Sequence, residues 1–336
     1  MLRILVTRID FLGDMVCTTA LIHALKQHWP EAEIHVLANK YNAPVLDRNP
    51  DVAAVHTYVY SKQCERNLRP GKLNALIDRL ALIWRLRRLR FNLAIIPNGG
   101  VSKNSIQFVR QLNVADCRWH TAESEFDDRV ASHAASRQMK HESLSGFTLL
   151  PELASTDIDT LRLYIYPKPQ LQTQWRSWFG DKNKPRIGLF ISNKSVDRRW
   201  SWQKWHDVII GLEPKTELFI FHDPAEKPTD EELAHLPARC LSTPSVPDMI
   251  AAMSQLDLVV SADSAPIHLS AALQIPVVAL FENRPEKYLR WYPLGVPHIL
   301  LREGRQVEDI QAQSVIEAVS CLLDSKIQPL KERDFH

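Results

Sequence analysis

The chain has 336 residues, of which 45% are hydrophobic and 24% charged, and its formal net charge is only +2. This length suits two domains of ordinary size, each with its own hydrophobic core. The composition is typical of a globular protein, and a charge so near zero excludes a protein that binds polyanions over its whole surface. We therefore expect no nucleic-acid partner, and any attraction to phosphate must be local.

The five cysteines are scattered and contain no C-x-x-C pair, which favours a reducing, cytoplasmic location. Arg8 and Asp10 interrupt what would have to be the apolar core of a signal peptide. No run of about 18 apolar residues occurs anywhere. We therefore expect a cytoplasmic protein that is neither exported by such a signal nor membrane-spanning.

The first half of the chain alternates strand and helix patterns, which predicts a parallel sheet with right-handed crossovers. The predicted strands are the RILVTR stretch at the N-terminus, 33–38, 53–60, 93–96 and 115–119. The predicted helices are Met15–His28, 41–48, 72–90 and, more weakly, 133–150. The PNGG turn at 97–100 should lie at the same edge of the sheet as Asp14.

The helix predicted over 72–90 is amphipathic and basic, and Arg66 and Arg69 precede it. Its apolar side is predicted to carry Leu76, Leu80, Ile83 and Leu86. Such a helix is either a solvated face over a sheet or a surface that approaches an anionic lipid or a phosphorylated acceptor. On the second interpretation, Arg66, Arg69 and Lys72 are candidate acceptor-binding residues.

Prolines and polar residues over 151–169 mark the predicted domain boundary, which gives domains of 1–155 and 156–336. The Asp157–Asp159 stretch matches the D-x-D pattern of metal-dependent sugar transferases, but no buried strand precedes it, so coincidence is favoured. The second half has predicted strands at 186–192, 217–222, 239–241, 256–260 and in the run that ends at Phe281. Its predicted helices are 203–212, 229–236, 247–254, one that begins near Ser264, 286–292 and 314–323, before a tail from Ser325 that should fray.

The most informative run is LDLVVSADSAPIHLSAALQIPVVALF, residues 256–281. Its apolar start predicts a strand buried on both faces, and Asp263, Ser264 and Pro266 are typical of the first turn of a helix. The N–H groups of that turn would lie at the carboxyl edge of the sheet and suit a phosphate, with His268 within reach. Two interpretations stay open, a phosphate site or a simple helix cap beside a packed His268.

Several catalytic motifs are absent from the sequence, namely G-x-G-x-x-G, G-x-x-x-x-G-K-[ST], H-E-x-x-H and G-x-S-x-G. We therefore expect no dinucleotide cofactor, no Walker loop, no metal site and no hydrolase elbow. What remains is two α/β domains with polar loops at their carboxyl edges. Those edges would form one cleft if they face each other.

Three stretches resemble the heptosyltransferases of glycosyltransferase family 9. RILVTR with the FLGD that ends at Asp14 resembles the opening of that family, and the RRWS that begins at Arg198 resembles its K-x-W-P stretch. The DSAPIH that begins at Asp263 resembles its D-[ST]-G-x-x-H donor motif. The stretches occur in the family's order, and the similarity spans nearly the whole chain.

The resemblance implies the α/β GT-B fold, in which two Rossmann-like α/β domains face each other across a cleft. Residues 1–155 would bind the acceptor and 156–336 the nucleotide-sugar donor. The implied activity is an inverting, metal-independent glycosyl transfer without a cofactor, which moves a heptose from ADP-heptose to an anionic lipopolysaccharide or lipooligosaccharide core acceptor. Such an enzyme would work in the cytoplasm, in peripheral contact with the inner face of the cytoplasmic membrane.

Carried over residue by residue, the resemblance makes Asp14 the general base that takes a proton from the acceptor hydroxyl, with Asp10 as the alternative base and acceptor contact. The start of a helix would keep Asp14 ionised with a lowered pKa; the competing interpretation is that Asp14 only caps the helix. Arg198 stands where the family has a lysine that faces the diphosphate. The other implied donor-binding residues are Glu226, Asp263, Ser264, Ala265 and His268.

Three departures from the family's pattern bear on function: Ala265 replaces a glycine, Glu282 and Asn283 replace glycine-proline, and Ala20 replaces a proline. Ala265 crowds the closest approach of backbone to phosphate. Glu282 would repel a diphosphate unless it points away or meets the sugar. These departures suggest one alternative, a non-catalytic relative that only binds sugar nucleotide or lipid. A second alternative is a GT-B-fold sugar-nucleotide epimerase, because such enzymes also join two domains of this kind.

Overall fold

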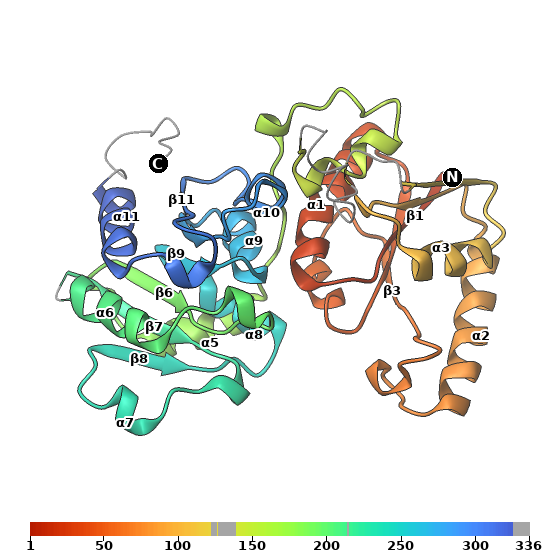
Figure 1. Cartoon of the computed structure of the whole chain (residues 1–336). Helices are drawn as coiled ribbons and strands as arrows, with labels where there is room; N and C mark the ends of the chain where they lie inside the picture. Colours follow the sequence, from red (N-terminus) through yellow and green to blue (C-terminus); the bar gives the residue numbers. More distant parts are fainter. Residues whose placement is uncertain (122–125, 127–138, 214, 325–336) are drawn as a thin grey trace. The chain divides into compact units, whose positions relative to one another are not determined.

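The computed structural model describes residues 1–121, 126, 139–213 and 215–324. The chain divides into two compact units, Met1–Tyr166 and Pro167–His336, and each contains one parallel sheet covered by helices (Figure 1). The boundary lies later than the predicted one after residue 155, because the connecting segment packs on the first unit. Leu161 and Leu163 are buried there, and the backbone N–H of Tyr164 donates to Oγ1 of Thr19 at 2.9 Å.

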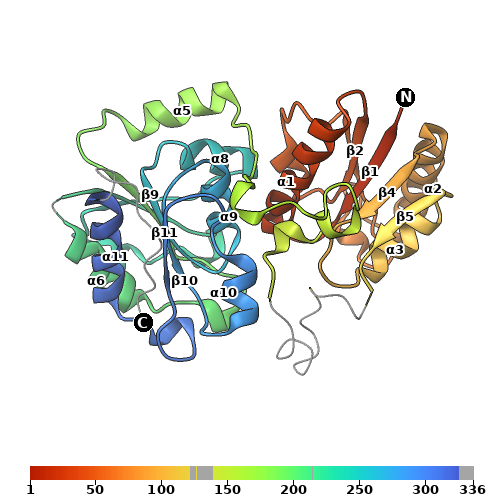
Figure 2. The ribbon, with the colours of Figure 1, turned by 90° about the horizontal axis from the view of Figure 1, so that it is seen from above.

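The sheet of the first unit has the parallel order β3-β2-β1-β4-β5. Its strands are β1 (Arg3–Arg8), β2 (Glu33–Ala38), β3 (Ala54–Thr57), β4 (Leu93–Ile96) and β5 (Asp116–Trp119). Its helices are α1 (Leu12–His28), α2 (Lys72–Leu89) and α3 (Lys103–Arg110), with 3-10 helices η1 (Ala43–Leu46), η2 (Cys64–Arg66), η3 (Glu142–Leu144), η4 (Phe147–Leu149) and η5 (Ile158–Thr160). Helix α1 covers one face of the sheet, and α2 and α3 cover the other (Figure 2). The strand order reverses between β1 and β4, which is where open α/β sheets bind ligands.

Two of the α-helices predicted for this unit do not form in the described residues. The segment 41–48 forms only the short η1, because the side chain of Asn39 accepts hydrogen bonds from the backbone of Tyr41 and Asn42 and so replaces helical ones. The segment 139–150 forms η3 and η4, whereas 133–138 lies outside the described residues. Helix α3 was not predicted.

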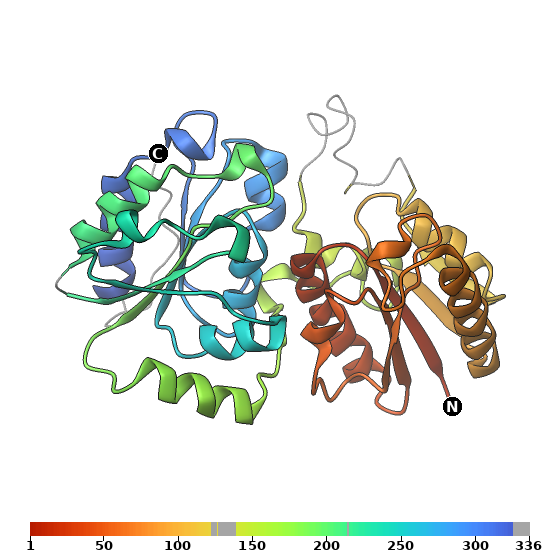
Figure 3. The same cartoon turned by 90° about the horizontal axis from the view of Figure 1, so that it is seen from below.

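The sheet of the second unit has the parallel order β11-β10-β9-β6-β7-β8, which reverses between β6 and β9. Its strands are β6 (Arg186–Phe190), β7 (Glu217–Phe221), β8 (Ala238–Leu241), β9 (Leu258–Ala262), β10 (Val277–Leu280) and β11 (His298–Leu301). Its helices are α5 (Pro169–Phe179), α6 (Trp202–Leu212), α7 (Asp230–Leu233), α8 (Val246–Met253), α9 (Ala265–Ala272), α10 (Pro285–Trp291) and α11 (Ala312–Asp324), with η6 (Val196–Arg198), η7 (Pro224–Glu226) and η8 (Val307–Asp309). Helices α6 and α11 pack on one face, and α8 and α9 lie on the other (Figure 3). Helix α5 and strand β11 were not predicted, and the tail expected to fray lies outside the described residues.

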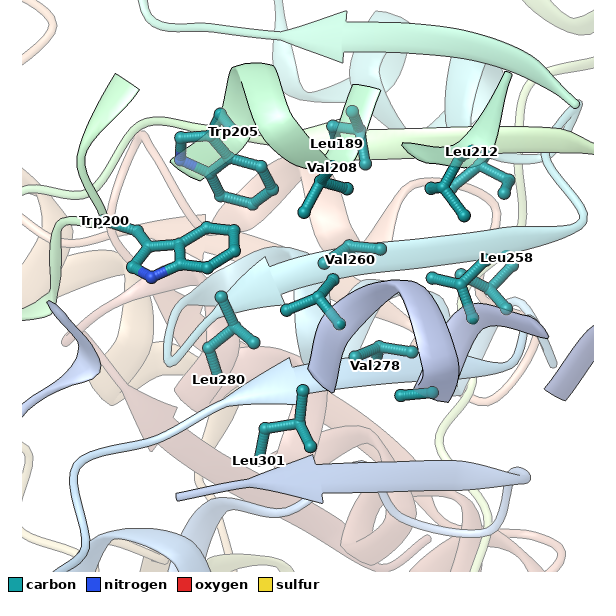
Figure 4. Packing of buried hydrophobic residues seen from close by; sticks show 14 of the residues in the cluster. Leu189, Trp200, Trp205, Val208, Leu212, Leu258, Val260, Val278, Leu280 and Leu301 are labelled. Atoms are coloured by element: carbon teal, nitrogen blue, oxygen red, sulfur yellow. The ribbon is translucent and has the colours of Figure 1, made fainter. Parts of the chain in front are cut away.

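Two tryptophans fix the loop that follows β6. Trp200 and Trp205 meet edge to face with ring centroids 4.9 Å apart and pack into the core beside Val260 and Leu280 (Figure 4). The indole N–H of Trp200 also donates to the carbonyl oxygen of Ile310 at 3.0 Å. The sequence just before these anchors is therefore held at the carboxyl edge of the sheet.

Within the described residues, no helix is long and apolar enough to cross a membrane. No group of three or more His, Cys, Asp or Glu side chains in that part of the chain could hold a metal ion. The D-x-D match lies in the exposed turn η5, where the side chain of Asp157 accepts a hydrogen bond from the backbone of Asp159 at 3.1 Å. The carboxylate of Asp157 thus serves a local turn.

Candidate active site

The first polar cluster surrounds the buried side chain of Arg8, at the carboxyl end of β1. Arg8 forms ion pairs with Asp14, with Glu142 (Nη2 to Oε1, 2.9 Å) and with Asp10 (Nε to Oδ2, 3.5 Å). Its Nη1 donates to the carbonyl oxygen of Pro97 at 2.9 Å. Burial opposes the charge of Arg8, but the three carboxylates outweigh burial and raise its pKa further above the usual value. One buried cation therefore holds three carboxylates in place.

Asp14 is the third residue of α1, yet it does not cap that helix. The N-cap residue is Phe11, no side chain caps the helix, and the carboxylate of Asp14 faces Arg8. Burial raises the pKa of Asp14 to about 6; Arg8 opposes the rise, and Asp10 and Glu142 add to it. The predicted lowered pKa is therefore wrong, because burial outweighs the helix start. A carboxylate with this pKa is mostly ionised at pH 7 and keeps a useful proton affinity, as a general base requires.

The loop after β4 meets the loop after β1 at this cluster. The side-chain amide of Asn98 donates to Asp10, and the backbone N–H of Gly99 donates to Oε1 of Glu142 at 3.1 Å. The prediction that the PNGG turn shares the sheet edge of Asp14 is confirmed. Glu142 was missed, because its local sequence resembles weak helix and its partner Arg8 lies 134 residues away.

The predicted acceptor-binding side chains are exposed, namely Arg66 at the end of η2, Arg69 in the segment between η2 and α2, and Lys72 at the start of α2. The guanidinium of Arg66 lies 4.5 Å from the ring centroid of Tyr60, whose hydroxyl donates to the carbonyl oxygen of Ile9 at 3.1 Å. Tyr60 thus connects Arg66 to the β1 loop. Arg69 instead forms an ion pair with Asp78 of α2.

The second polar cluster lies in the second unit, after β6, β9 and β10. Nη1 of Arg198 lies 3.1 Å from Oδ2 of Asp263, and Nε lies 3.5 Å from Oε1 of Glu282. The side-chain amide of Asn193 donates to the carbonyl oxygen of Asp263 at 3.1 Å. Burial raises the pKa of Asp263, Arg198 and Lys287 oppose the rise, and Glu282 adds to it. The protein's own carboxylates therefore compensate the charge of Arg198.

Helix α9 begins directly after Asp263. Ser264 is its N-cap by position, but its hydroxyl contacts Oγ of Ser261 at 3.2 Å and makes no cap bond, so the interpretation of a simple cap is wrong for Ser264. Ala265 is the first helical residue. His268 is buried, with its ring centroid 5.8 Å from that of Trp291 in an edge arrangement. The packing expected of His268 is thus present.

Glu226 lies in η7, after β7, and forms an ion pair with Arg199. Nε of Arg199 donates to the carbonyl oxygen of Asn193 at 2.8 Å, so Arg199 links the β6 and β7 loops. Sequence reasoning assigned no site role to Arg199 or Asn193. The only signal for Arg199 was its place in the RRWS stretch, and Asn193 gave none.

Comparison with known proteins agrees with this geometry. The model of glycosyltransferase family 9 (heptosyltransferase) matches residues 79–318, well over half of the chain. Lipopolysaccharide heptosyltransferase 3 of Escherichia coli K12 is 22% identical over 339 residues, which cover 93% of this chain and 95% of that protein. The resemblance found in the sequence is therefore confirmed.

Two solved structures share the fold. The family 9 glycosyltransferase of Veillonella parvula aligns with a TM-score of 0.77 at 17% identity and covers 96% of this chain and 97% of that one. An Escherichia coli heptosyltransferase solved with ADP-2-deoxy-2-fluoro heptose aligns with a TM-score of 0.68 at 16% identity, covering 97% and 100%. With two Rossmann-like parallel sheets, each with polar residues at its point of reversal, the chain is a GT-B glycosyltransferase that belongs to family 9.

Proposed function

We propose that the protein moves a heptose from ADP-heptose to an anionic lipopolysaccharide or lipooligosaccharide core acceptor, with inversion at the anomeric carbon and without a metal ion. The name of the Escherichia coli relative supports the acceptor class, and the donor analogue bound to the structural neighbour supports the donor class. The proposed location is the cytoplasm, at the inner face of the cytoplasmic membrane.

The observation that carries the proposal is the carboxylate of Asp14 held against Arg8 with a pKa of about 6. In a single displacement, Asp14 takes the proton of the acceptor hydroxyl as that oxygen attacks the anomeric carbon and ADP leaves. Arg8 orients Asp14 and limits the rise of its pKa. Asp10, in the same loop, is the acceptor contact and the alternative base. The family match begins at residue 79, so the role of Asp14 rests on this geometry and on the sequence resemblance.

On the donor side, the first turn of α9 and Arg198 would receive the diphosphate as its negative charge grows. The proposed donor-binding residues are Arg198, Glu226, Asp263, Ser264, Ala265 and His268. Asp263 holds Arg198 by an ion pair, and the uncapped start of α9 lies directly beside it. Glu226 would leave its ion pair with Arg199 and contact the ribose of the donor nucleotide. The second unit is thus the proposed donor domain.

The first unit is the proposed acceptor domain. Beside Asp10, the residues proposed to bind the charged groups of the core are Arg66, Arg69 and Lys72. Their support is their exposure and the contact of Arg66 with Tyr60, which reaches the β1 loop that precedes Asp14. Arginine and lysine at these positions suit phosphate or carboxylate groups.

The test is an incubation of the protein with ADP-heptose and a heptose-deficient core oligosaccharide in excess EDTA. We expect ADP release, a product heavier by one heptose, and an inverted anomeric configuration by NMR. A strict magnesium or manganese requirement, or retained configuration, would contradict the mechanism. Conversion of donor without acceptor would indicate an epimerase, and donor binding with no transfer to any core acceptor would indicate a non-catalytic relative.

A further inference from the structure

Helix α2 has two apolar faces, of which only one is buried. Its inner side chains Ala75, Leu82 and Leu86 pack against the sheet of the first unit. A second set of large apolar side chains is between 52% and 71% exposed, and we define these as the outer face: Leu73, Leu76, Ile77, Leu80 and Trp84. The predicted grouping of Leu76 and Leu80 with Leu86 on one apolar side is therefore wrong, because Leu86 is buried and the other two are exposed.

The outer face is one continuous stripe. Its residues follow the spacing of three and four that places side chains on one side of a helix, at about 100° per residue. The stripe points away from the inner face, and Figure 1 shows α2 with one side against its sheet and the other side turned away from the strands. Isolated exposed apolar residues are ordinary, whereas a contiguous stripe of five on one helix marks an interaction surface.

Basic residues surround this stripe. Residues 61–90 contain nine Lys and Arg against two acids, a net charge of +7 where the whole chain has +2. Of the two acids, Asp78 is ion-paired with Arg69. The guanidinium of Arg88 lies 4.6 Å from the ring centroid of Trp84, and exposed Lys72 and Arg85 lie beside the stripe. An apolar stripe with a cationic border is complementary to a surface whose outer layer is anionic and whose layer beneath is apolar.

We propose that α2 docks on an anionic lipid bilayer, with the outer face in the boundary between headgroups and acyl chains and the helix parallel to the membrane surface. The basic border contacts anionic headgroups, as in interfacial amphipathic helices. A second copy of the chain is a poorer occupant, because it would bring the same +7 segment against this one. The inference rests on the proposed location at the inner face of the cytoplasmic membrane and deepens it, because it names the surface that makes the contact. Docking of this surface needs neither donor nor acceptor.

The test is flotation of the full chain with vesicles of phosphatidylcholine alone or with about one third phosphatidylglycerol. We expect binding to the anionic vesicles that is at least about tenfold tighter than to neutral ones and that weakens as salt is raised. The triple variant Leu76→Ser, Leu80→Ser, Trp84→Ser should lose at least about tenfold in this binding. Exposed apolar residues elsewhere provide the matched control: Tyr41→Ser, Val55→Ser and Ile210→Ser, which should bind as the parent does.

A second variant keeps the test decisive if the apolar triple variant does not fold. Lys72→Glu, Arg85→Glu and Arg88→Glu retain the outer face and should also abolish the preference for anionic vesicles. Parent protein that ignores both kinds of vesicle would overturn the proposal, as would equal binding by the parent and both variants. A concentration-dependent dimer that the apolar variant abolishes, without vesicle binding, would assign the face to a second copy. Glycosyl transfer to a soluble acceptor should be unchanged in the apolar variant. Loss of vesicle binding would therefore leave the proposed glycosyl transfer intact, and absence of transfer in the parent would leave the docking proposal intact.

Discussion

The carboxylate of Glu282 lies 3.5 Å from Nε of Arg198, and the Glu282 side chain is only 13% exposed. Together with the closer Asp263, it compensates the positive charge of Arg198 before any donor arrives. On the proposed donor site, a diphosphate would therefore compete with two carboxylates for this guanidinium. Glu282 neither points away from the cluster nor lies far from Arg198, so its charge should weaken donor binding.

The first prediction follows from that charge. Glu282→Gln keeps the size of the side chain and removes its repulsion of the diphosphate, which is worth at least about 1 kcal/mol, the value for two charges about 4 Å apart in water. We expect the dissociation constant for ADP-heptose to fall about fivefold, as measured by calorimetry at low salt. The matched control is Glu286→Gln, because Glu286 pairs with Arg284, as Glu282 also does, but is not one of the two carboxylates that hold Arg198. Weaker donor binding by Glu282→Gln would show that Glu282 contacts the sugar.

The second prediction concerns the buried cation of the first cluster. Arg8→Met leaves the buried carboxylate of Glu142 without its cation, which typically costs about 3–5 kcal/mol of stability. We expect the melting temperature of the first unit to fall by roughly 10 °C. The double variant Arg8→Met, Glu142→Gln should recover much of that loss, because it removes both charges. Additive losses in the double variant would show that the pair is not coupled.

The third prediction concerns the acceptor. Replacing Arg66, Arg69 and Lys72 by glutamine should raise the KM for a soluble core oligosaccharide about tenfold at low salt, where screening is weak. Donor affinity should not change. A control with three exposed basic residues of the second unit, Arg176, Lys184 and Lys215, should behave as the parent. Equal acceptor kinetics in the two triple variants would remove these residues from the acceptor site.

Much of the fold could be predicted, because buried parallel strands such as Leu258–Ala262 are continuous apolar runs, and helices such as α8 and α9 have a proline in the first turn. Helix α5 was missed because its first residue, Pro169, looked like part of a linker. Strand β11 has only four residues and α3 only eight. Neither is long enough to show a sustained periodic spacing of apolar residues. The inner and outer faces of α2 could not be told apart, because both are apolar and only tertiary contacts decide which one is buried.

The candidate site was predictable only where one local motif carried it. Asp14 and its partner Arg8 lie together in one stretch that resembles a known family, whereas Asp263 and Glu282, the partners of Arg198, come from elsewhere in the chain. Glu142 reaches Arg8 across 134 residues, and no local pattern marks such a contact. The pKa of Asp14 was predicted in the wrong direction for the same reason, since its burial is a property of the folded unit.

The fourth prediction is a pH dependence of stability. The pKa of Asp14 in the folded state is about 6, above its ordinary value of 3.8. Between pH 3.8 and pH 6, Asp14 therefore holds a proton in the folded state that it has lost in the unfolded state. The contribution of Asp14 to stability is therefore present at low pH and lost as the pH rises from about 4 to about 6. Denaturant unfolding of the parent and of Asp14→Asn across this range should show the parent losing stability relative to the variant. Parallel curves would contradict the raised pKa.

The most direct test of the proposed mechanism is the transfer rate of Asp14→Asn at pH 7 to 8. Asparagine has nearly the same size but cannot take the proton, and a positioned base typically contributes about 10²–10⁴ in rate. We predict a loss of kcat of that order, with donor affinity little changed, a melting temperature no lower than that of the parent, and a parent rate that falls below pH 6 as Asp14 becomes protonated. A variant that keeps its kcat would contradict the assignment and direct the search for the base to Asp10.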